Sequence, residues 1–315
     1  IFVFLVLWCE ALDHLCRHTF RGQMGNSKSS SSSSSKRTPK NVVSKSVVQA
    51  KLRNAHKLGV LSLTEHKLTV VPLQIFEISM LKTLDLSFNE IREFPSSDYC
   101  SSLPNLKTLN LSNNRLYKGS LPNLTCLKNL QNLNLSDNNI GQESGQKTNT
   151  KKITKTATPA SAHTLLSLPP LPTSLKTLNL AKNSLNSIPP QALALPNLTS
   201  LTLSNNSIAS IPTSMSSLSS LKNLYLDENS LTSLPPPLFA EGRCCWPDLK
   251  TLDLSNNGFA TAGFSTLSAT SVDQPLPKGL FTDTKLHDLR LAGNPMEKRV
   301  LMEEFEGFDA FLKRR

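Results

Sequence analysis

The chain has 315 residues, is 38% hydrophobic but only 6% aromatic, and carries 34 Lys and Arg against 23 Asp and Glu, a formal net charge of +11. At this length a single globular core is unusual. The six cysteines show neither terminal clusters nor metal-ligand spacing, which argues against a disulfide-clamped extracellular chain or a zinc module and indicates a reducing, cytoplasmic setting.

The positive charge is unevenly distributed. Residues 24–57 hold eight basic and no acidic residues, and residues 141–174 hold four basic and one acidic, so the remaining chain is neutral. A basic segment beside a neutral body favours contact of that segment with an anionic surface. It argues against nucleic acid as a partner of the body, since a chain that grips nucleic acid places its basic residues along the binding groove.

Residues 1–23 are interpreted as upstream sequence outside the mature protein. The reason is the hexapeptide Met24-Gly25-Asn26-Ser27-Lys28-Ser29, which fits the N-myristoylation pattern M-G-x-x-x-[ST] and would place the acyl chain on the amine of Gly25. A truncated signal peptide is the alternative for the apolar residues 1–8, which are too few to span a bilayer.

Residues 24–40 are predicted to be a disordered, basic, serine-rich arm. One myristoyl chain gives only marginal membrane binding, and each basic residue near an anionic leaflet adds about 1 kcal/mol. We therefore expect residues 25–45 to bind an anionic membrane surface, which would make this a cytoplasmic, peripheral membrane protein. The alternative is a tail that is merely solvated.

Residues 41–57 are predicted to form an amphipathic helix, with Val43, Val47, Ala50 and Leu58 on its apolar face. We expect this helix to cap the open end of the array that follows, since the first unit would otherwise expose apolar surface. A helix that lies on a membrane is the alternative.

One eleven-residue frame, L-x-x-L-x-L-x-x-N-x-L, recurs along residues 58–296. Its eight full copies place asparagine at Asn89, Asn114, Asn138, Asn183, Asn206, Asn229, Asn257 and Asn294, and a degenerate ninth copy at residues 58–68 has His66 in that place. The frame resembles the leucine-rich repeat, in which one strand and one returning segment make each unit. The resemblance implies an α/β solenoid, a leucine-rich repeat horseshoe with a parallel concave sheet, about nine repeats and helical caps at both ends.

The residue types within the frame have separate structural roles. Its leucines are predicted to point inward, and its asparagine to bond to backbone groups of neighbouring turns, because a buried unpaired group costs about 1–3 kcal/mol. Proline-containing segments such as residues 187–190 and 210–212 predict short irregular or 3₁₀ turns on the convex side rather than long helices.

The asparagine spacing, regularly 23 to 25 residues, widens most to 45 and to 37, which predicts insertions at residues 141–164 and 261–284. After the last repeat, apolar residues recur three and four apart at Leu301, Phe305, Phe308, Phe311 and Leu312. Residues 297–315 are therefore predicted to form a C-terminal cap helix.

The residue between the last two leucines of each copy is expected on the concave face, because strand side chains alternate. These candidate partner-binding residues are Asp85, Asn110, Asn134, Asn179, Thr202, Tyr225, Asp253 and Arg290. Most are small and polar, whereas Tyr225 and Arg290 are of types enriched at binding hot spots. The alternative is an ordinary solvated strand surface.

No catalytic site, cofactor or metal is expected. The six histidines have no partner at metal or nucleophile spacing, and the sequence has neither a glycine-rich phosphate loop nor a G-x-S-x-G motif. The sequence therefore predicts a non-enzymatic binding protein.

Three stretches resemble intracellular leucine-rich repeat proteins of the Ras-group-related kind: the Met24-Gly25-Asn26-Ser27 start, residues 55–63 and residues 304–309. The resemblance implies a membrane-associated, myristoylated interaction protein. We therefore expect a scaffold or adaptor in small-GTPase signalling, whose concave face binds a protein partner. Two alternatives remain open: a soluble regulatory subunit that docks a phosphatase or kinase, and a nucleic-acid binder that uses the basic arm.

Overall fold

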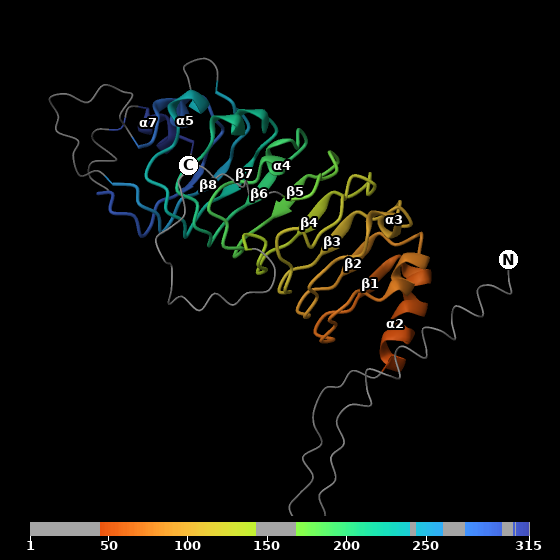
Figure 1. Cartoon of the computed structure of the whole chain (residues 1–315). Coiled ribbons are helices and arrows are strands. Elements are labelled where there is room, and N and C mark those ends of the chain that lie inside the picture. Colours follow the sequence, from red (N-terminus) through yellow and green to blue (C-terminus); the bar gives the residue numbers. More distant parts are fainter. Residues whose placement is uncertain are drawn as a thin grey trace, which may run out of the picture. The chain divides into compact units, whose positions relative to one another are not determined.

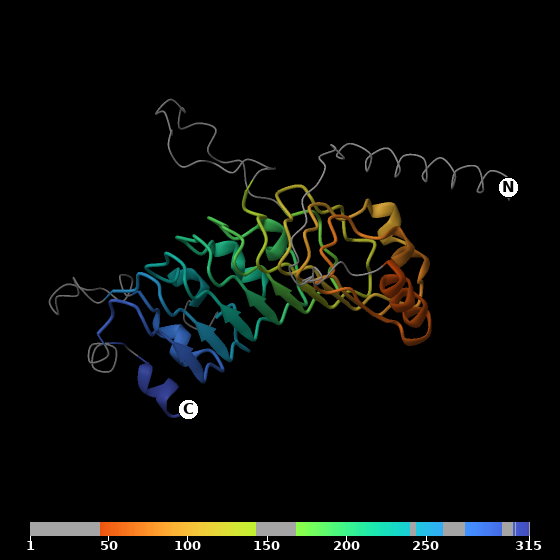
Figure 2. The same ribbon diagram turned by 90° about the horizontal axis from the view of Figure 1, so that it is seen from below.

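The computed structural model describes residues 45–142, 168–239, 244–260, 275–297, 305 and 307–314. Across these residues, nine short strands form one parallel sheet in which each strand pairs with the next in sequence (Figure 1, Figure 2). The strands are β1 (Val60–Ser62), β2 (Thr83–Asp85), β3 (Thr108–Asn110), β4 (Asn132–Asn134), β5 (Thr177–Asn179), β6 (Ser200–Thr202), β7 (Asn223–Tyr225), β8 (Thr251–Asp253) and β9 (Asp288–Arg290). The predicted leucine-rich repeat solenoid with a parallel sheet is therefore confirmed.

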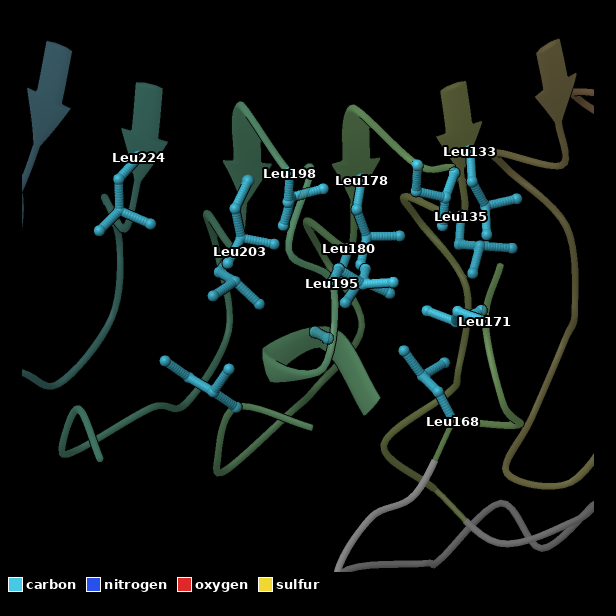
Figure 3. Packing of buried hydrophobic residues seen from close by; sticks show 14 of the residues in the cluster. Leu133, Leu135, Leu168, Leu171, Leu178, Leu180, Leu195, Leu198, Leu203 and Leu224 are labelled. Carbon is cyan, nitrogen blue, oxygen red and sulfur yellow. The ribbon is translucent and has the colours of Figure 1, made fainter. Parts of the chain in front are cut away.

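The central residue of every strand is a leucine that points into the core. Register stacks these leucines, so that Leu178 of β5 lies between Leu133 of β4 and Leu201 of β6. All are buried except Leu289 of β9, which is partly buried. Figure 3 shows Leu133, Leu178 and Leu224 on the inner side of their strands with leucines of the returning segments below them. Each buried leucine contributes about 2 kcal/mol of transfer free energy, so the repeated frame itself builds the core.

Helix α2 (Lys45–Leu58) covers the first repeat. Leu52 and Ala55 are buried in the core, and Val48 packs against it while partly exposed. These residues are spaced four and three apart, which places them on one face of the helix.

The predicted apolar face of this helix was wrong. Val47 and Ala50 are exposed, and Leu58 is 72% exposed; Val43 lies outside the described residues. Leu58 is the last helical residue, and the next residue, Gly59, has a left-handed φ of +68° that turns the chain into β1. The first leucine of the degenerate copy therefore leaves the core, whereas its counterparts in the full copies are buried.

Each frame asparagine joins two repeats through its side-chain amide. The amide of Asn183, which is fully buried, donates from Nδ2 to the carbonyl of Leu135 in the preceding repeat at 2.9 Å. Nδ2 also donates to the carbonyls of Leu180 and Ala181 in its own turn. Oδ1 accepts from the backbone amide of Ile140, again in the preceding repeat.

The same links to the preceding repeat recur at every other frame asparagine, namely Asn89, Asn114, Asn138, Asn206, Asn229, Asn257 and Asn294. The predicted structural role of the asparagines is thus confirmed. A buried amide that serves four backbone groups is not available to a ligand.

Where the returning segments are described, their helical turns are all short. Those of 3₁₀ type are η1 (Leu73–Glu77), η3 (Thr213–Ser217) and η4 (Pro236–Phe239), and the single α-turns are α3 (Ser97–Cys100), α4 (Pro190–Leu193) and α5 (Lys278–Thr282). Pro189 and Pro212 lie immediately before α4 and η3 in extended conformation. Proline therefore starts these turns, as the sequence predicted.

The first insertion leaves the sheet uninterrupted, since β4 pairs directly with β5. It also begins later than predicted. The amide of Gly141 donates to the carbonyl of Asn183 at 2.9 Å, and a Cβ at Gly141 would lie 2.3 Å from the carbonyl oxygen of Ser184. Residues 141 and 142 therefore belong to the repeat, residues 143–167 lie outside the described residues, and buried Leu168 and Leu171 resume the core (Figure 3).

The second predicted insertion, residues 261–284, is too long. Leu276, Leu280 and Phe281 are fully buried, and α5 lies within this range. The amide of Leu234 donates to the carbonyl of Pro275 at 2.9 Å, which ties the segment to the previous repeat. Residues 275–284 are thus the returning segment between the seventh and eighth full copies of the frame. Residues 261–274 lie outside the described residues.

Aromatic side chains cover the last repeat. Phe305, Phe308 and Phe311 are buried, and the ring centroids of Phe281 and Phe308 lie 5.4 Å apart in an edge-to-face arrangement. Arg314 donates from Nε to a backbone carbonyl of the last repeat at 3.1 Å. The C-terminal residues therefore cover apolar side chains, and bond to polar backbone groups, that the end of the array would otherwise expose.

A single cap helix over residues 297–315 is not what the structure contains. The described helix, α7 (Phe308–Leu312), begins after Gly307, whose left-handed φ of +84° cannot lie inside an α-helix. Leu312 is 41% exposed rather than part of the buried stripe, and Leu301 lies outside the described residues.

We predict that Asn183→Ala lowers the free energy of unfolding by about 2–4 kcal/mol, because three buried backbone groups and one partly buried group lose their partner. Chemical denaturation followed by circular dichroism measures the change. Asn132→Ala is the matched control, since Asn132 is exposed and its side chain makes only a long contact to Thr108 at 3.3 Å. Equal losses in the two variants would contradict the role assigned to the asparagines.

Candidate partner-binding surface

The eight candidate residues occupy one continuous column across the sheet. Each is the last residue of its strand, and the register places each beside the next, from Asp85 beside Asn110 to Asp253 beside Arg290. Ser62 of β1 pairs with Asp85 and belongs to the same column. We refer to these nine residues as the sheet column.

Sequence reasoning missed Ser62. Its signal was present, because Ser62 stands between Leu61 and Leu63, as every other member of the sheet column stands between two leucines of its copy. The degenerate asparagine position of that copy obscured it.

Five members of the sheet column bond back to their own turn. Oδ1 of Asp85 accepts from the backbone amide of Ser87, two residues further on, at 3.0 Å. The same bond is made by Asn110, Asn134, Asn179 and Asp253. Bonds of this kind hold the chain as it leaves the strand. These side chains therefore stabilise the turn before they can serve a partner.

Thr202, Tyr225 and Arg290 make no such bond within the described chain. Thr202 and Tyr225 lie side by side on β6 and β7 and are partly exposed. Tyrosine offers a large, rigid contact area together with a hydroxyl that both donates and accepts.

Arg290 is held by two carboxylates. Its guanidinium lies 3.3 Å from Oδ2 of Asp253 and 2.9 Å from Oδ2 of Asp288, and Nε also donates to Asp288. The hydrogen bonds that Arg290 donates to Asp288 and, less strongly, the charge of Asp253 raise the pKa of Arg290 above its ordinary value. The guanidinium has five N–H donors, so it stays charged and oriented with donors left for a further acceptor.

The second half of the sheet column thus differs from the first. Four adjacent strands, β6 to β9, carry Thr202, Tyr225, Asp253 and Arg290 in register. Strands lie about 4.8 Å apart, so these four side chains span roughly 15 Å. The group combines one aromatic ring, two hydroxyls and an oriented ion pair, and its tyrosine and arginine are residue types enriched at binding hot spots.

A second polar ladder lies at the edge where the strands begin, here called the strand-start edge. Asn129 donates from Nδ2 to the carbonyl of Pro104 in the preceding repeat at 2.8 Å. The equivalent bonds of other repeats are made by Asn105, Asn197 and Ser220, whereas Ser174 donates to the carbonyl of Leu130, the first leucine of the preceding copy. Sequence reasoning missed these residues, although each directly precedes the first leucine of its copy.

The four cysteines of the described chain, Cys100, Cys126, Cys244 and Cys245, are free thiols. Burial, with a smaller contribution from neighbouring Cys126, raises the pKa of Cys100 to about 12. Burial also raises the pKa of Cys244. A buried, protonated thiol such as Cys100 is a core residue rather than a nucleophile.

Other candidate sites are limited to what the described residues contain. In that part of the chain, no three His, Cys, Asp or Glu side chains gather where they could hold a metal ion. None of the helices that can be described is both long and apolar enough to cross a bilayer. Gly25 and the basic residues that precede α2 lie outside the described residues.

Comparisons with known proteins agree with the fold. Leucine-rich repeat family models match residues 79–125 (two copies), 123–147, 173–231 and 248–269. A leucine-rich repeat protein of Leptospira interrogans is 26% identical with a TM-score of 0.52, over 81% of this chain and 58% of that one. A structure described as a TDR receptor is 22% identical with a TM-score of 0.52, over 75% and 35%.

The chain therefore spans little more than half the length of the first solved structure that it resembles. No curated protein matches its sequence. The comparisons agree with a leucine-rich repeat fold, and leucine-rich repeat domains generally mediate protein–protein interaction.

We predict that Cys100 resists alkylation by iodoacetamide at a pH of about 8. With a pKa of about 12, its thiolate fraction there is on the order of one in ten thousand. Peptide mass spectrometry of the native protein should find Cys100 largely unmodified and less labelled than Cys126. Denaturation before labelling should make the two cysteines react alike. Rapid labelling of native Cys100 would show that this part of the core opens readily.

Proposed function

We propose that this leucine-rich repeat protein is a non-catalytic adaptor that binds another protein through the second half of the sheet column, on the concave face. The observation that carries the proposal is the set of Thr202, Tyr225, Asp253 and Arg290 in register on β6 to β9. Side chains in the first half are mostly occupied by their own turns, whereas Tyr225 and Arg290 present surface and donors outward.

The position of Arg290 supports a protein ligand. An isolated arginine loses much side-chain freedom on binding, but Arg290 is already oriented by Asp253 and Asp288. Preorganised contacts of this kind cost less on association. A partner that supplies a carboxylate or a carbonyl can accept the remaining guanidinium donors, while its apolar surface covers the ring of Tyr225.

The second part of the proposal is attachment to the cytoplasmic side of a membrane. Gly25 fits the myristoylation pattern when translation begins at Met24, and Lys28, Lys36 and Arg37 follow closely. An acyl chain and a basic segment together give stable anchoring, which neither supplies alone. With the resemblance to the Ras-group-related kind, this favours a partner in small-GTPase signalling at a membrane.

We predict that Tyr225→Ala and Arg290→Ala each weaken partner binding at least tenfold, because hot-spot truncations cost about 1.4 kcal/mol or more. Affinity capture from cells with quantitative mass spectrometry, followed by titration of the captured protein, measures the loss. Arg92→Ala removes the same charge from an exposed position outside the sheet column and serves as the control. Tyr225→Phe should retain most binding if the ring provides the contact.

Full binding by both alanine variants would contradict the proposed surface. Capture of a phosphatase or kinase catalytic subunit by a chain that is unlipidated would instead favour a soluble regulatory subunit.

We predict that Gly25→Ala moves the protein from the membrane to the soluble fraction of cells, because alanine at this position is not acylated. Asn26→Ala keeps the pattern intact and should remain on the membrane. Intact mass of the wild-type protein should show a chain that begins at Gly25 with one added myristoyl group. A chain that retains residues 1–23, or an unmodified Gly25, would contradict the anchor.

A further inference from the structure

A row of lysines runs along the strand-start edge. The residue after the first leucine of the frame is lysine in five of the eight full copies, at Lys82, Lys107, Lys176, Lys222 and Lys250. We refer to these five as the lysine row. The remaining three copies have Gln131, Thr199 and His287, so no copy has an acidic residue there.

Backbone hydrogen bonds place these positions next to one another. The amide of Lys107 donates to the carbonyl of Lys82 at 2.8 Å, and that of Lys250 to the carbonyl of Lys222 at 2.8 Å. The same bond continues through Gln131, Lys176 and Thr199 between them. Because this ladder of backbone hydrogen bonds is continuous, it holds the lysines in line across the sheet.

The charges of the lysine row are not neutralised within the described structure. All five side chains are exposed, and no ion pair of the described residues includes any of them. Asp248 lies at the same edge, where its carboxylate is bound by Lys285 at 2.6 Å. That hydrogen bond and, less strongly, the charges of Lys222 and Lys250 lower the pKa of Asp248, so it offsets part of the charge at this end of the row. Like charges held in line repel one another, so an anionic ligand would relieve an existing repulsion.

The middle of the lysine row faces a hollow. Its volume is about 760 Å³, and three cations, Lys128, Lys176 and Lys222, line it together with one carboxylate, Asp248, and with serine, threonine, asparagine and glutamine side chains. The hydroxyls of Ser174, Thr199 and Ser220 already donate to backbone carbonyls. The donors left for a carboxylate are chiefly the ammonium groups and the second amide N–H of Asn129 and of Asn197. The hollow thus offers both charge and shape to a ligand that lies across β4 to β8.

Carboxylates gather at the other end of the strands. Asp85 and Asp253 end β2 and β8, and Asp137 and Asp227 follow β4 and β7. Arg290 ends β9 and Lys182 follows β5, so this edge carries both signs of charge, whereas the strand-start edge is mainly basic. An anionic ligand is therefore favoured at the strand-start edge over the opposite one.

We propose that the lysine row is the docking site for an extended acidic segment of a protein partner. The proposal rests on the proposed function in that the partner is a protein, but it concerns a different edge from the sheet column. The row crosses six intervals of about 4.8 Å, so an extended segment of about nine residues spans it. A single-stranded nucleic acid is less well matched, because no row position of the described chain carries an aromatic ring on which bases could stack.

The test uses the full-length chain and a fluorescein-labelled peptide of about ten residues in which glutamate and serine alternate. The row variant replaces Lys107, Lys176 and Lys222 by glutamine. The matched control replaces Lys57, Lys67 and Lys182, three exposed lysines outside the row, in the same way. Both variants keep the basic N-terminal arm, so any binding by the arm is common to the two proteins.

We expect fluorescence anisotropy at low salt to show at least a tenfold loss of peptide affinity in the row variant and little change in the control. Raising the salt to about 0.15 M should weaken binding to the wild type more than to the row variant, since screening acts on exposed charges. An equal loss of peptide affinity in the row variant and in the control variant, or no loss in either, would overturn the proposal. Tighter, row-dependent binding of a single-stranded oligonucleotide of equal charge would overturn the assignment of a protein segment.

This result is separable from that for the sheet column. If Tyr225→Ala and Arg290→Ala leave partner binding intact while the row variant loses it, the lysine row stands and the proposed hot spot fails. The reverse outcome removes the lysine row alone. The substituted lysines are exposed, so unchanged thermal unfolding of both variants confirms that the fold is retained.

Discussion

Each turn of this solenoid leaves backbone carbonyls and amides facing the next turn, and the amide of the frame asparagine satisfies them. Asn183 shows the arrangement fully buried, with three carbonyls accepting from Nδ2 and one amide donating to Oδ1. Without this side chain, adjacent repeats could stack their leucines only by burying unpaired polar groups. The parallel register of the strands, and with it every side-chain column on the sheet, depends on that link.

Because the structural work is assigned to leucine and asparagine, the other strand positions are free to differ between repeats. Even so, these strand positions differ in whether their side chains are already bound to their own turns. Asp85, Asn110 and Asn134 bond to their own turns, whereas Tyr225 and Arg290 on later strands do not. The two ends of the strands also differ in charge. A neutral array can in this way present a hot spot on one column and a cationic edge beside it, with specificity set by the arrangement of charge rather than by its total.

Much of the fold could be predicted from the sequence because one frame encodes both core and links. Leucines three and two apart and a fixed asparagine were enough for the sheet, the inward side chains and the short convex turns. The ends were harder, since a cap has no repeated partner to define its face: the sequence offered Val47 and Leu58, and the first repeat buries Leu52 and Ala55. Residues 275–284 looked like part of an insertion because the asparagine spacing of 37 residues gives the extra length but not where the returning segment resumes.

The sequence predicts where the candidate residues lie but not which of their side chains are already hydrogen-bonded. Alternation along a strand places Asp85 and Tyr225 in one column, yet only coordinates show that Asp85 accepts from Ser87 while Tyr225 remains available. The second ladder, from Asn129 to Pro104 and its equivalents, was visible in the sequence only as a preference for asparagine and serine. Its partners lie one repeat away, about twenty-five residues along the chain.

Site-specific photocross-linking in cells tests the central claim most directly. A benzophenone amino acid at position 225 should form a covalent adduct with one protein, whereas the same group at the exposed Tyr99 of α3, on a returning segment, should form none. That outcome would establish the second half of the sheet column as the binding surface. Equal adducts at both positions, or adducts at Tyr99 alone, would contradict it.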